Sequence, residues 1–562
     1  MYRFGNATVT RVRGARRRSA RGLFLGGVAV TSMVLTMAAA SAASGPKLST
    51  HGVGTEGPYP WKYPASGNVK VGTGTTIGGA KCTPGAQQFA TPYAPPCVAK
   101  FTGSNGGATY NGVTANTITI AVRTFPSTAN QEEIAAQLAA AGDAPQQVTN
   151  QVEQVFLNYF NKAYDLYGRK VVLQSMTATS NATLEALGQN QAQACADADT
   201  IANQMHAFAE SGIPEDFAGG GTSPFSTCAA QRKLVEFFGN AYYSETTFQG
   251  ENPYVWSWTP DCQRIAANMA EVIGTELAGK KAIYAGDPNL RNSVRVIGTF
   301  IPNVPSYINC NGSPNALENK LLETKYHVPA SQISQFFHYN LDISTFQQSA
   351  QQAIVQFKAA GVTTIVLACD PFSLGLLTQA AAAQNYHPEW MLQGVAATDT
   401  DNEAQTYNQS EIDGHMFGVS EAAATNSIFG PSSPAGKLYQ KLTGRQIPKQ
   451  TDGDYPYLVE MFDALQAAGP DLTPQNLARG IHALPILGGP TFPYGAWNWN
   501  TGPTGIAGAG DHTAVVDARL VYWSGNTVSP VNGKMGTFIA IDNGKRFGLG
   551  TYPKTLPKLF TQ

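Results

Sequence analysis

Apolar and polar residues alternate in blocks of strand and helix length along this chain from residue 117 onward. The run TITIAV, 117–122, has the continuous apolar pattern of a buried strand, and RKVVLQSM predicts the next strand. Between them, QVEQVFLNYFNKAYDLYG places apolar residues on one helical face and ends at Gly168. The chain therefore opens its ordered part with a strand, a helix and a second strand.

The same alternation continues through this first series and through a second series that starts at KKAIYAG. The predicted strands are, in chain order, DFAGG, NAYYS, YVWSW, KKAIYAG, SQFFHY, VTTIVLACD and EWMLQG. The predicted helices are an Ala/Gln-rich helix with Cys195 and Met205, a helix that begins in GGGTSPFSTCAAQRK (219–233) and extends beyond Lys233, DCQRIAANMAEVIGTEL with Asp261 as N-cap, and helices near 289–301, 344–360 and 373–385. After HMFGVSEAA come the helices PAGKLYQKLTG, YPYLVEMFDALQAAG and TPQNLARGIHAL, the last capped by Thr473, and then the β-like runs AWNWN, TAVVDARLVYW and GTFIAID.

Regular alternation of strands and helices favours parallel sheets that are covered by helices. The strands of the two series number roughly ten, which is more than one sheet of ordinary size needs. The predicted fold class is therefore α/β with two Rossmann-like lobes. Charged residues make up only 13% of the 562 residues, and the body of the chain has no basic patch, which argues against a nucleic-acid-binding protein.

The N-terminus has the layout of a secretory signal peptide. Arginines precede the apolar run LFLGGVAVTSMVLTMAAASA, which ends in the small residues Ala40, Ser41 and Ala42. An uncut membrane anchor is the alternative. Residues 1–42 hold seven Arg and no acid, so their removal would change the formal charge from −1 to −8. We expect an exported, extracytoplasmic protein whose residues 43–115, rich in Gly and Pro, form an irregular extension or linker.

Seven cysteines in an exported chain predict disulfides, with one thiol remaining. Cys82 and Cys97 lie alone in the extension and are expected to pair. Cys195 and Cys228 lie in or at the start of consecutive predicted helices and could join them. The sequence does not choose among Cys262, Cys310 and Cys369. No C-x-x-C is present and the histidines are scattered, so neither a metal nor another cofactor is expected.

The stretch GGGTSPFSTCAAQRK resembles several enzyme loops but has the spacing of none. It lacks the Gly-Lys-Ser/Thr of a phosphate loop, the third glycine of a dinucleotide fingerprint and the G-x-S-x-G of a nucleophile elbow. Glycines at a strand end followed by hydroxyl groups at a helix start instead suit ligand binding. N-capping by Ser226 or Thr227 is the alternative role.

Other predicted strand ends carry similar hydroxyl, aromatic and acidic residues, and in open α/β sheets ligands bind outside the carboxyl ends of the strands. For Asp370 the alternative is helix capping, and for the acids DTDNE at 399–403 it is a solvated loop, because the spacing of a calcium loop is missing. The candidate ligand-binding residues are Phe125, Thr222, Ser223, Ser226, Thr246, Thr247, Asp370, Phe372, Asp399 and Tyr455.

Six stretches of the chain together carry a family resemblance: TITIAV, the unit GGGTSPFSTCAAQRKLVEFFGNAYYSET, YVWSWTPD, KKAIYAGD, the stretch from FQQSAQQ to EWMLQG, and DYPYLVEMFDALQAAGPDLTPQNLARGI. In their order and spacing, the chain resembles the type I periplasmic binding proteins of the leucine-binding-protein-like branch. The resemblance covers roughly residues 116–545. It implies lobes joined by a three-crossover hinge, with residues 116–259 and 421–487 in lobe 1, 260–420 in lobe 2, and 488–562 as the return through the hinge and the tail. It also implies that hydroxyl groups around 222–226 and 244–247 hold the ligand, and it supports the Cys195–Cys228 pair.

The function that follows is that of a non-enzymatic, monomeric solute-binding protein. It would capture a small polar ligand, such as an amino acid or amide, and deliver it to the permease of an ABC importer. A sensory ligand-binding protein on the same fold and an exported hydrolase are the alternatives. Amino-acid binders place an acid of lobe 2 against the ligand's ammonium group. The matching loop here is GVAATDTDN, in which Asp399 is the candidate.

Overall fold

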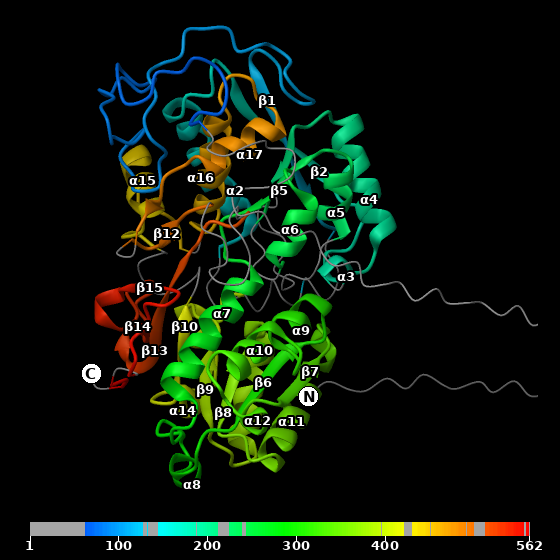
Figure 1. Cartoon of the computed structure of the whole chain (residues 1–562), viewed down its shortest axis with the longest axis vertical. Coiled ribbons are helices and arrows are strands. Elements are labelled where there is room, and N and C mark those ends of the chain that lie inside the picture. Colours follow the sequence, from blue (N-terminus) through cyan, green and yellow to red (C-terminus); the bar gives the residue numbers. More distant parts are fainter. Residues whose placement is uncertain are drawn as a thin grey trace, which may run out of the picture. The chain divides into compact units, whose positions relative to one another are not determined.

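The computed structural model describes residues 62–126, 132, 144–186, 188–211, 224–238, 243–394, 396–420, 430–449, 451–489, 492–499, 512–555 and 558–560. Its elements form two main sheets, one parallel and one mixed, with helices packed against them (Figure 1). We call the sheet nearer the N-terminus in sequence, with its helices, lobe 1, and the other sheet with its helices lobe 2.

Lobe 1 is built on five parallel strands in the order β2-β1-β3-β4-β5. These are β1 (Thr117–Thr124), β2 (Lys170–Thr177), β3 (Ala209–Ser211), β4 (Val235–Phe238) and β5 (Val255–Ser257). The helices between them are α2 (Gln146–Ala163), α3 (Ala182–Ala186), α4 (Gln191–Asp199), α5 (Pro224–Gln231) and α6 (Glu245–Glu251). Parallel pairing of these strands requires the helical crossovers that the sequence alternation predicts.

Lobe 2 continues the alternation around a larger sheet. Its parallel strands, in the order β7-β6-β8-β9-β10, are β6 (Ile297–Pro302), β7 (Gln335–Tyr339), β8 (Thr364–Leu367), β9 (Glu389–Leu392) and β10 (Met416–Ser420). The antiparallel strands β13 (Asp517–Val528), β14 (Met535–Ala540) and β15 (Arg546–Gly548) extend it beyond β10. The helices are α7 (Cys262–Val272), α8 (Pro288–Asn292), α9 (Pro305–Asn311), α10 (Leu317–Thr324), α11 (Ile343–Ala359), α12 (Pro371–Ala383), α13 (Asp401–Ala404) and α14 (Gln409–Ile412).

After β10 the chain returns to the core of lobe 1. The returning elements are α15 (Pro434–Thr443), α16 (Tyr455–Ala468), α17 (Pro474–His482), β11 (Leu487–Gly488) and β12 (Ala496–Trp497). Their apolar residues share one buried cluster with α2 and the strands of lobe 1. The chain thus crosses between the lobes after β5, after β10 and after β12.

The first and third crossings lie side by side, because Ser257 forms a β-bridge with Thr513 and the Ala514 amide donates to the Ser257 carbonyl at 3.0 Å. The predicted fold class is confirmed: two Rossmann-like sheets joined by three crossovers, the arrangement of the type I periplasmic binding proteins.

The third and fourth strands of lobe 1 are β3 and the run VEFF of β4. The predicted strand DFAGG lies outside the described residues, and of the predicted strand NAYYS only Tyr243 and Ser244 are described, where Ser244 caps α6. The helix α5 does not extend through Lys233 as the sequence predicted. Lys233 has a left-handed backbone with φ 59°, which ends the helical segment and turns the chain into the strand.

The start of lobe 2 was also predicted incorrectly. KKAIYAG is not a strand of the sheet, and only Lys281 in it forms an isolated bridge, to Val294. The range near 289–301, predicted as one helix, holds the short helix α8 at its start and overlaps the first strand, β6, at its end; all six residues of β6 are buried. A continuous apolar run has no periodicity that separates a buried strand from a buried helix, so the pattern could not decide.

The extension is irregular, as predicted, but residues 62–115 are packed on lobe 1 and are not a linker. The Ala65 amide donates to the Ala467 carbonyl at 2.8 Å, and the Thr109 hydroxyl donates to the Leu472 carbonyl at 2.8 Å. Arg169 donates to two further carbonyl groups of the extension, those of Asn105 and Gly107. Figure 1 shows this segment in blue beside the orange helices of the return.

Three disulfides are present among the described cysteines. Cys82 pairs with Cys97 and Cys195 with Cys228, as predicted, and Cys262 pairs with Cys310, which the sequence left open. Cys369 remains a buried thiol. Cys195 lies in α4 and Cys228 in α5, so this bridge joins the two helices that flank β3 in the chain.

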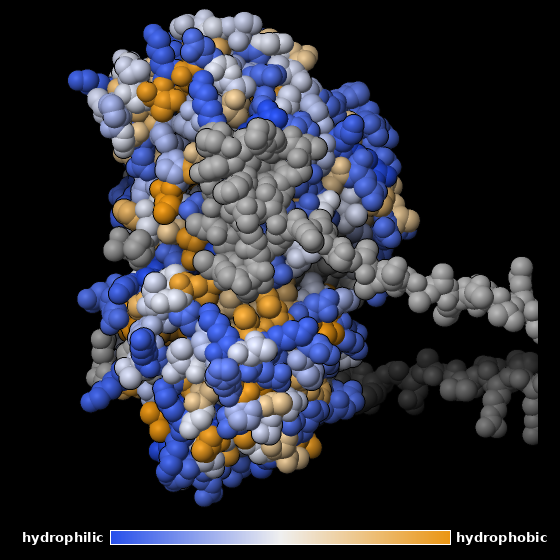
Figure 2. All heavy atoms as spheres, in the orientation of Figure 1, coloured by the Kyte–Doolittle hydropathy of each residue, from blue (hydrophilic) through white to orange (hydrophobic). Residues whose placement is uncertain are grey.

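Hydrophilic residues cover much of the described surface on the face drawn in Figure 2, with small hydrophobic patches between them. In the described part of the chain, no helix combines the length and the apolar character needed to cross a membrane.

Candidate functional site

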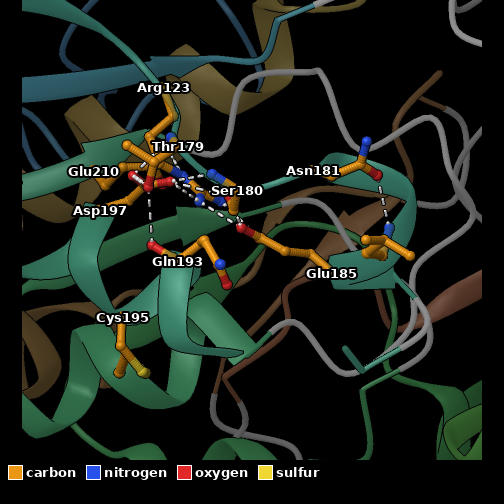
Figure 3. Close-up of polar contacts among 11 residues, drawn as sticks. Arg123, Thr179, Ser180, Asn181, Glu185, Gln193, Cys195, Asp197 and Glu210 are labelled. Carbon is orange, nitrogen blue, oxygen red and sulfur yellow. Dashed lines mark hydrogen bonds and ion pairs between the residues drawn. A yellow bond between two sulfur atoms is a disulfide. The ribbon is translucent and has the colours of Figure 1, made fainter. Parts of the chain in front are cut away.

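A buried arginine stands at the carboxyl end of β1, where ligands of open α/β sheets bind (Figure 3). The Arg123 guanidinium donates two parallel hydrogen bonds to the Glu185 carboxylate, at 3.0 and 3.1 Å. It also lies 3.5 Å from the Asp197 carboxylate and 3.9 Å from that of Glu210. All four side chains are buried, so this is a fully desolvated ion-pair network.

The network fixes the loop that follows β2. The Thr179 amide and hydroxyl both donate to Asp197 Oδ1, at 2.9 and 2.7 Å, and the Ser180 hydroxyl donates to Asp197 Oδ2 at 3.0 Å. Ser180 also contacts Glu185. Because Asp197 belongs to α4, the ends of β1 and β2 and the start of α3 are held to that helix.

The predicted residue Phe125 lies against this network. The Arg123 guanidinium carbon is 4.8 Å from the centroid of the Phe125 ring and 3.6 Å from that of Phe225. Such a contact is a cation–π interaction. Since Phe225 belongs to α5, the arginine connects the end of β1 to the helix that begins in the glycine-rich stretch.

Ser226 and Thr227 are helical residues of α5, so neither is its N-cap. Ser226 is fully buried, and its hydroxyl has no hydrogen-bond partner among the described residues. Burial, and next the charge of Glu210, raise the pKa of Glu236 well above its usual range. Thr227 instead donates to Glu251 of α6 at 2.7 Å. The predicted residues Thr222 and Ser223 lie outside the described residues.

Thr246 and Thr247 lie in the first turn of α6 and are half-buried. Ser244 caps this helix, accepting from the Thr247 amide at 3.1 Å. Between them, Glu245 is fully buried and accepts from the His512 backbone amide at 3.1 Å, while its other oxygen lies 2.9 Å from His512 Nδ1. The helix that carries the threonines is thereby tied to the third crossing.

In lobe 2, Asp370 is the N-cap of α12, the alternative role that the sequence left open. Its carboxylate accepts from the Ser373 amide at 2.8 Å and hydroxyl at 2.7 Å, and from the Tyr339 hydroxyl at 2.6 Å. Phe372, in the first turn of the same helix, is half-buried and packs against the α11–α12 side of the core.

Asp399 is fully buried after β9 and accepts a hydrogen bond from the Ser420 hydroxyl at 2.6 Å. Burial raises the pKa of its carboxyl group to about 6. Nearby, the Tyr407 hydroxyl donates to the Thr398 carbonyl at 3.4 Å. Burial, and next the charges of Glu403, Cys369, Asp370 and Asp399, raise the pKa of the Tyr407 phenol well above its usual range.

Tyr455 is a core residue. It is the first residue of α16, 1% exposed, and its ring lies 5.4 Å from Phe156 and 5.8 Å from Phe160. The structure thus gathers Phe125, Ser226 and α6 in lobe 1 and Asp370, Phe372 and Asp399 in lobe 2, and it places Tyr455 within the packing of lobe 1.

Arg123 and Tyr407 were missed as candidates. Arg123 had a usable signal, because it interrupts the apolar run of a buried strand immediately before the strand's carboxyl end. Tyr407 had none, since it lies in a polar stretch between short helices.

The polar side chains at these strand ends are better placed for hydrogen bonding than for catalysis. The hydroxyl groups of Ser373 and Ser420 are committed to carboxylates, and Arg123 is neutralised by its acidic partners. In the ranges that the structure describes, no group of three or more His, Cys, Asp or Glu side chains is arranged to hold a metal ion.

No protein-family model matches this chain, and no curated protein matches it. Several solved structures are similar. One is the leucine-, isoleucine-, valine-, threonine- and alanine-binding protein from Brucella ovis, with 12% identity over 78% of this chain and 98% of that one and a TM-score of 0.49. Another is an ABC-transporter solute-binding protein from Rhodopseudomonas palustris BisB5 in complex with 3,4-dihydroxybenzoic acid, with 12% identity, 77% and 98% coverage and a TM-score of 0.47.

A third is the branched-chain amino acid transporter substrate-binding protein from Streptococcus pneumoniae in complex with isoleucine, with 12% identity, 76% and 100% coverage and a TM-score of 0.45. All three are solute-binding proteins. The sheet order and the three crossings of this chain, rather than these low identities, define its fold.

Proposed function

We propose that this protein is an exported, extracytoplasmic solute-binding protein. It captures a small polar ligand, such as an amino acid or an amide, between its two lobes and delivers the ligand to the permease of an ABC importer. The signal-peptide layout of residues 1–42 supports export.

The observation that carries this proposal is that the chain has two lobes, and that in each lobe polar side chains and helix starts follow the carboxyl ends of parallel strands. In lobe 1 these are the end of β1 and the first turn of α6, and in lobe 2 they are the start of α12 and the turn with Asp399. Two polar surfaces joined by three crossings can close on a ligand by hinge motion.

The buried position of Ser226 favours binding over hydrolysis. A nucleophilic serine must reach its substrate and a general base, but Ser226 is fully buried inside α5 and its hydroxyl bonds to no imidazole among the described residues. The hydrolase alternative would then depend on Ser223.

A thermal-shift screen of the secreted chain tests the proposal. The compounds are amino acids, amides, short peptides, aromatic acids and sugars. A true ligand at a hundred times its dissociation constant should add about 2.7 kcal/mol to the free energy of unfolding. Failure of every class to shift the melting temperature would contradict solute binding, and turnover of a compound would favour the hydrolase.

Variants of the hydroxyl residues then test the site. Thr247→Val and Ser223→Ala should each weaken a confirmed ligand about tenfold by calorimetry, because each removes one ligand hydrogen bond. Thr324→Val, at an exposed position of α10, is the matched control and should leave the affinity unchanged. Equal affinities in all three variants would show that the ligand binds elsewhere in the protein.

Transport and sensing differ in the partner. Membrane vesicles that contain a permease and an ATPase encoded beside this chain should take up the ligand only when the protein is added. Ligand binding without such uptake would favour the sensory alternative.

A further inference from the structure

The packed extension contacts the segment that precedes the third crossing through one loop. The Cys82–Cys97 disulfide closes residues 83–96 into this loop. Near its far end, the Pro92 carbonyl accepts from the Gly488 amide at 2.7 Å, so the loop is bonded to β11 of the return.

Tyr93, the next residue, is inserted completely into the return. It is 0% exposed, its hydroxyl donates to the Gly495 carbonyl at 3.2 Å, and its ring centroid lies 4.7 Å from that of Trp497 and 5.3 Å from that of Tyr494. A Cβ at Gly488 would lie 2.4 Å from the Tyr93 ring, so this glycine makes room for the tyrosine.

The residues that Tyr93 contacts are themselves bonded to the start of β13 in lobe 2. The Ala496 amide donates to both Asp517 carboxylate oxygens at 3.2 Å, and Trp497 forms a β-bridge with Val515. Asp517 in turn accepts from Arg546 Nε of β15 at 2.6 Å, and Arg546 Nη1 donates to the Pro493 carbonyl at 3.4 Å.

Contacts therefore run without a break from the extension to the sheet of lobe 2. They pass from Tyr93 to the Gly495–Trp497 segment and from there to Asp517 and Arg546. The crossing at 512–517 lies on this route and is also bonded to the first crossing at Ser257.

We propose that Tyr93 is a positioning residue for the third crossing: held by its disulfide-closed loop, it restricts the conformations of residues 512–517. Under the proposed function, this restriction sets how readily the lobes move and hence how tightly the ligand is held. The extension would then be a fixed part of the hinge.

Hydrogen exchange of the full secreted chain, followed by mass spectrometry, tests the restriction without a ligand. Tyr93→Ala should speed exchange of peptides that cover 512–520 by about tenfold and leave peptides of α11 and α12 unchanged, because local opening exposes only nearby amides. Tyr93→Phe keeps the ring contacts and should restore most of the protection.

Tyr167→Ala is the matched control. Tyr167 is also buried between the extension and lobe 1, with its ring 5.3 Å from Phe101, but its hydroxyl donates to the Gln466 carbonyl of α16, ahead of α17 and the crossing. It should lower the melting temperature without a specific effect on 512–520. If Tyr93→Ala does no more than this, the positioning role is wrong.

The double variant Cys82→Ser/Cys97→Ser provides a second test should Tyr93→Ala fail to fold. It releases the loop while leaving the aromatic cluster intact, and it should also speed exchange of 512–520; unchanged exchange would contradict the proposal. With a ligand in hand, Tyr93→Ala should change its dissociation constant at least about fivefold and Tyr167→Ala should not. Because hydrogen exchange is measured without a ligand, it tests the positioning role of Tyr93 even if the solute-binding proposal fails.

Discussion

At the scale of single residues, buried carboxyl groups without a nearby cation make the folding stability of this protein depend on pH. Glu318 in α10 is 3% exposed, and its carboxyl group accepts one hydrogen bond, from the Asn311 amide group at 3.0 Å. Burial raises the pKa of Glu318 to about 7. A buried carboxyl group without a nearby cation favours its protonated form.

This shift makes folding stability depend on pH in a predictable direction. The folded state binds the Glu318 proton more tightly than the unfolded state, whose pKa is near 4.5. The free energy of unfolding should therefore fall as pH rises from about 4.5 to 7. At pH 8 the buried charge should cost about 3 kcal/mol.

We expect Glu318→Gln to be more stable than the natural chain at pH 8 by up to that amount, and the difference to vanish below pH 4. Urea denaturation at several pH values measures it. Glu323→Gln, at an exposed position of the same helix, is the control and should change stability by less than about 0.5 kcal/mol. A constant difference across pH would show that burial of Glu318 is not the cause.

At the element scale, α16 and α17 approach closely because a glycine faces their contact. A Cβ at Gly480 of α17 would lie 2.2 Å from the Ala467 carbonyl oxygen of α16. Since α16 carries much of the lobe 1 core, the seating of α17 affects that core directly.

Gly480→Ala should therefore destabilise the protein by about 1–3 kcal/mol, since backbone must shift to admit the methyl group. This is opposite in sign to helix propensity, which favours alanine by about 1 kcal/mol. Gly250→Ala in α6 is the control, because a Cβ there meets no atom within 4 Å. Chemical denaturation of both variants should give opposite signs; two stabilising changes would rule out the close contact.

The elements also show which local signals could be read. Caps were explicit: Asp261, Thr473 and the alternative for Asp370 are each confirmed by hydrogen bonds to the first turn of a helix. Buried strands gave no such explicit signal, because β4 and β6 are short, mainly apolar runs whose pairing partners are distant in sequence. Propensity cannot choose between a helix and a strand in such runs.

At the scale of the whole molecule, the extension belongs to lobe 1. Tyr93, Val98 and Val113 are at most 2% exposed and lie in buried clusters with residues of lobe 1. Their burial compensates for a segment that has almost no regular secondary structure of its own.

Removal of residues 43–115 should therefore lower the free energy of unfolding by about 5 kcal/mol or more, since each of these side chains contributes roughly 1.5–3 kcal/mol by burial. We expect a lower urea midpoint and new binding of a hydrophobic dye. Exchange protection in α11 and α12 of lobe 2 is the internal control. A truncated chain as stable as the full one would show that the packing contributes little.

The sequence by itself determined the fold class, most helices with their caps, two disulfides and the exclusion of phosphate-loop and nucleophile motifs, because these follow from short-range periodicity and spacing. Where Thr222 and Ser223 lie stays a prediction.

Tertiary structure alone decided that Arg123 is enclosed by Glu185 and Asp197, that Tyr455 belongs to the core and that Cys262 pairs with Cys310. It also decided that an irregular extension packs on lobe 1 and on the segment before the third crossing. Each of these depends on contacts between residues distant in sequence, and no local pattern encodes such a contact.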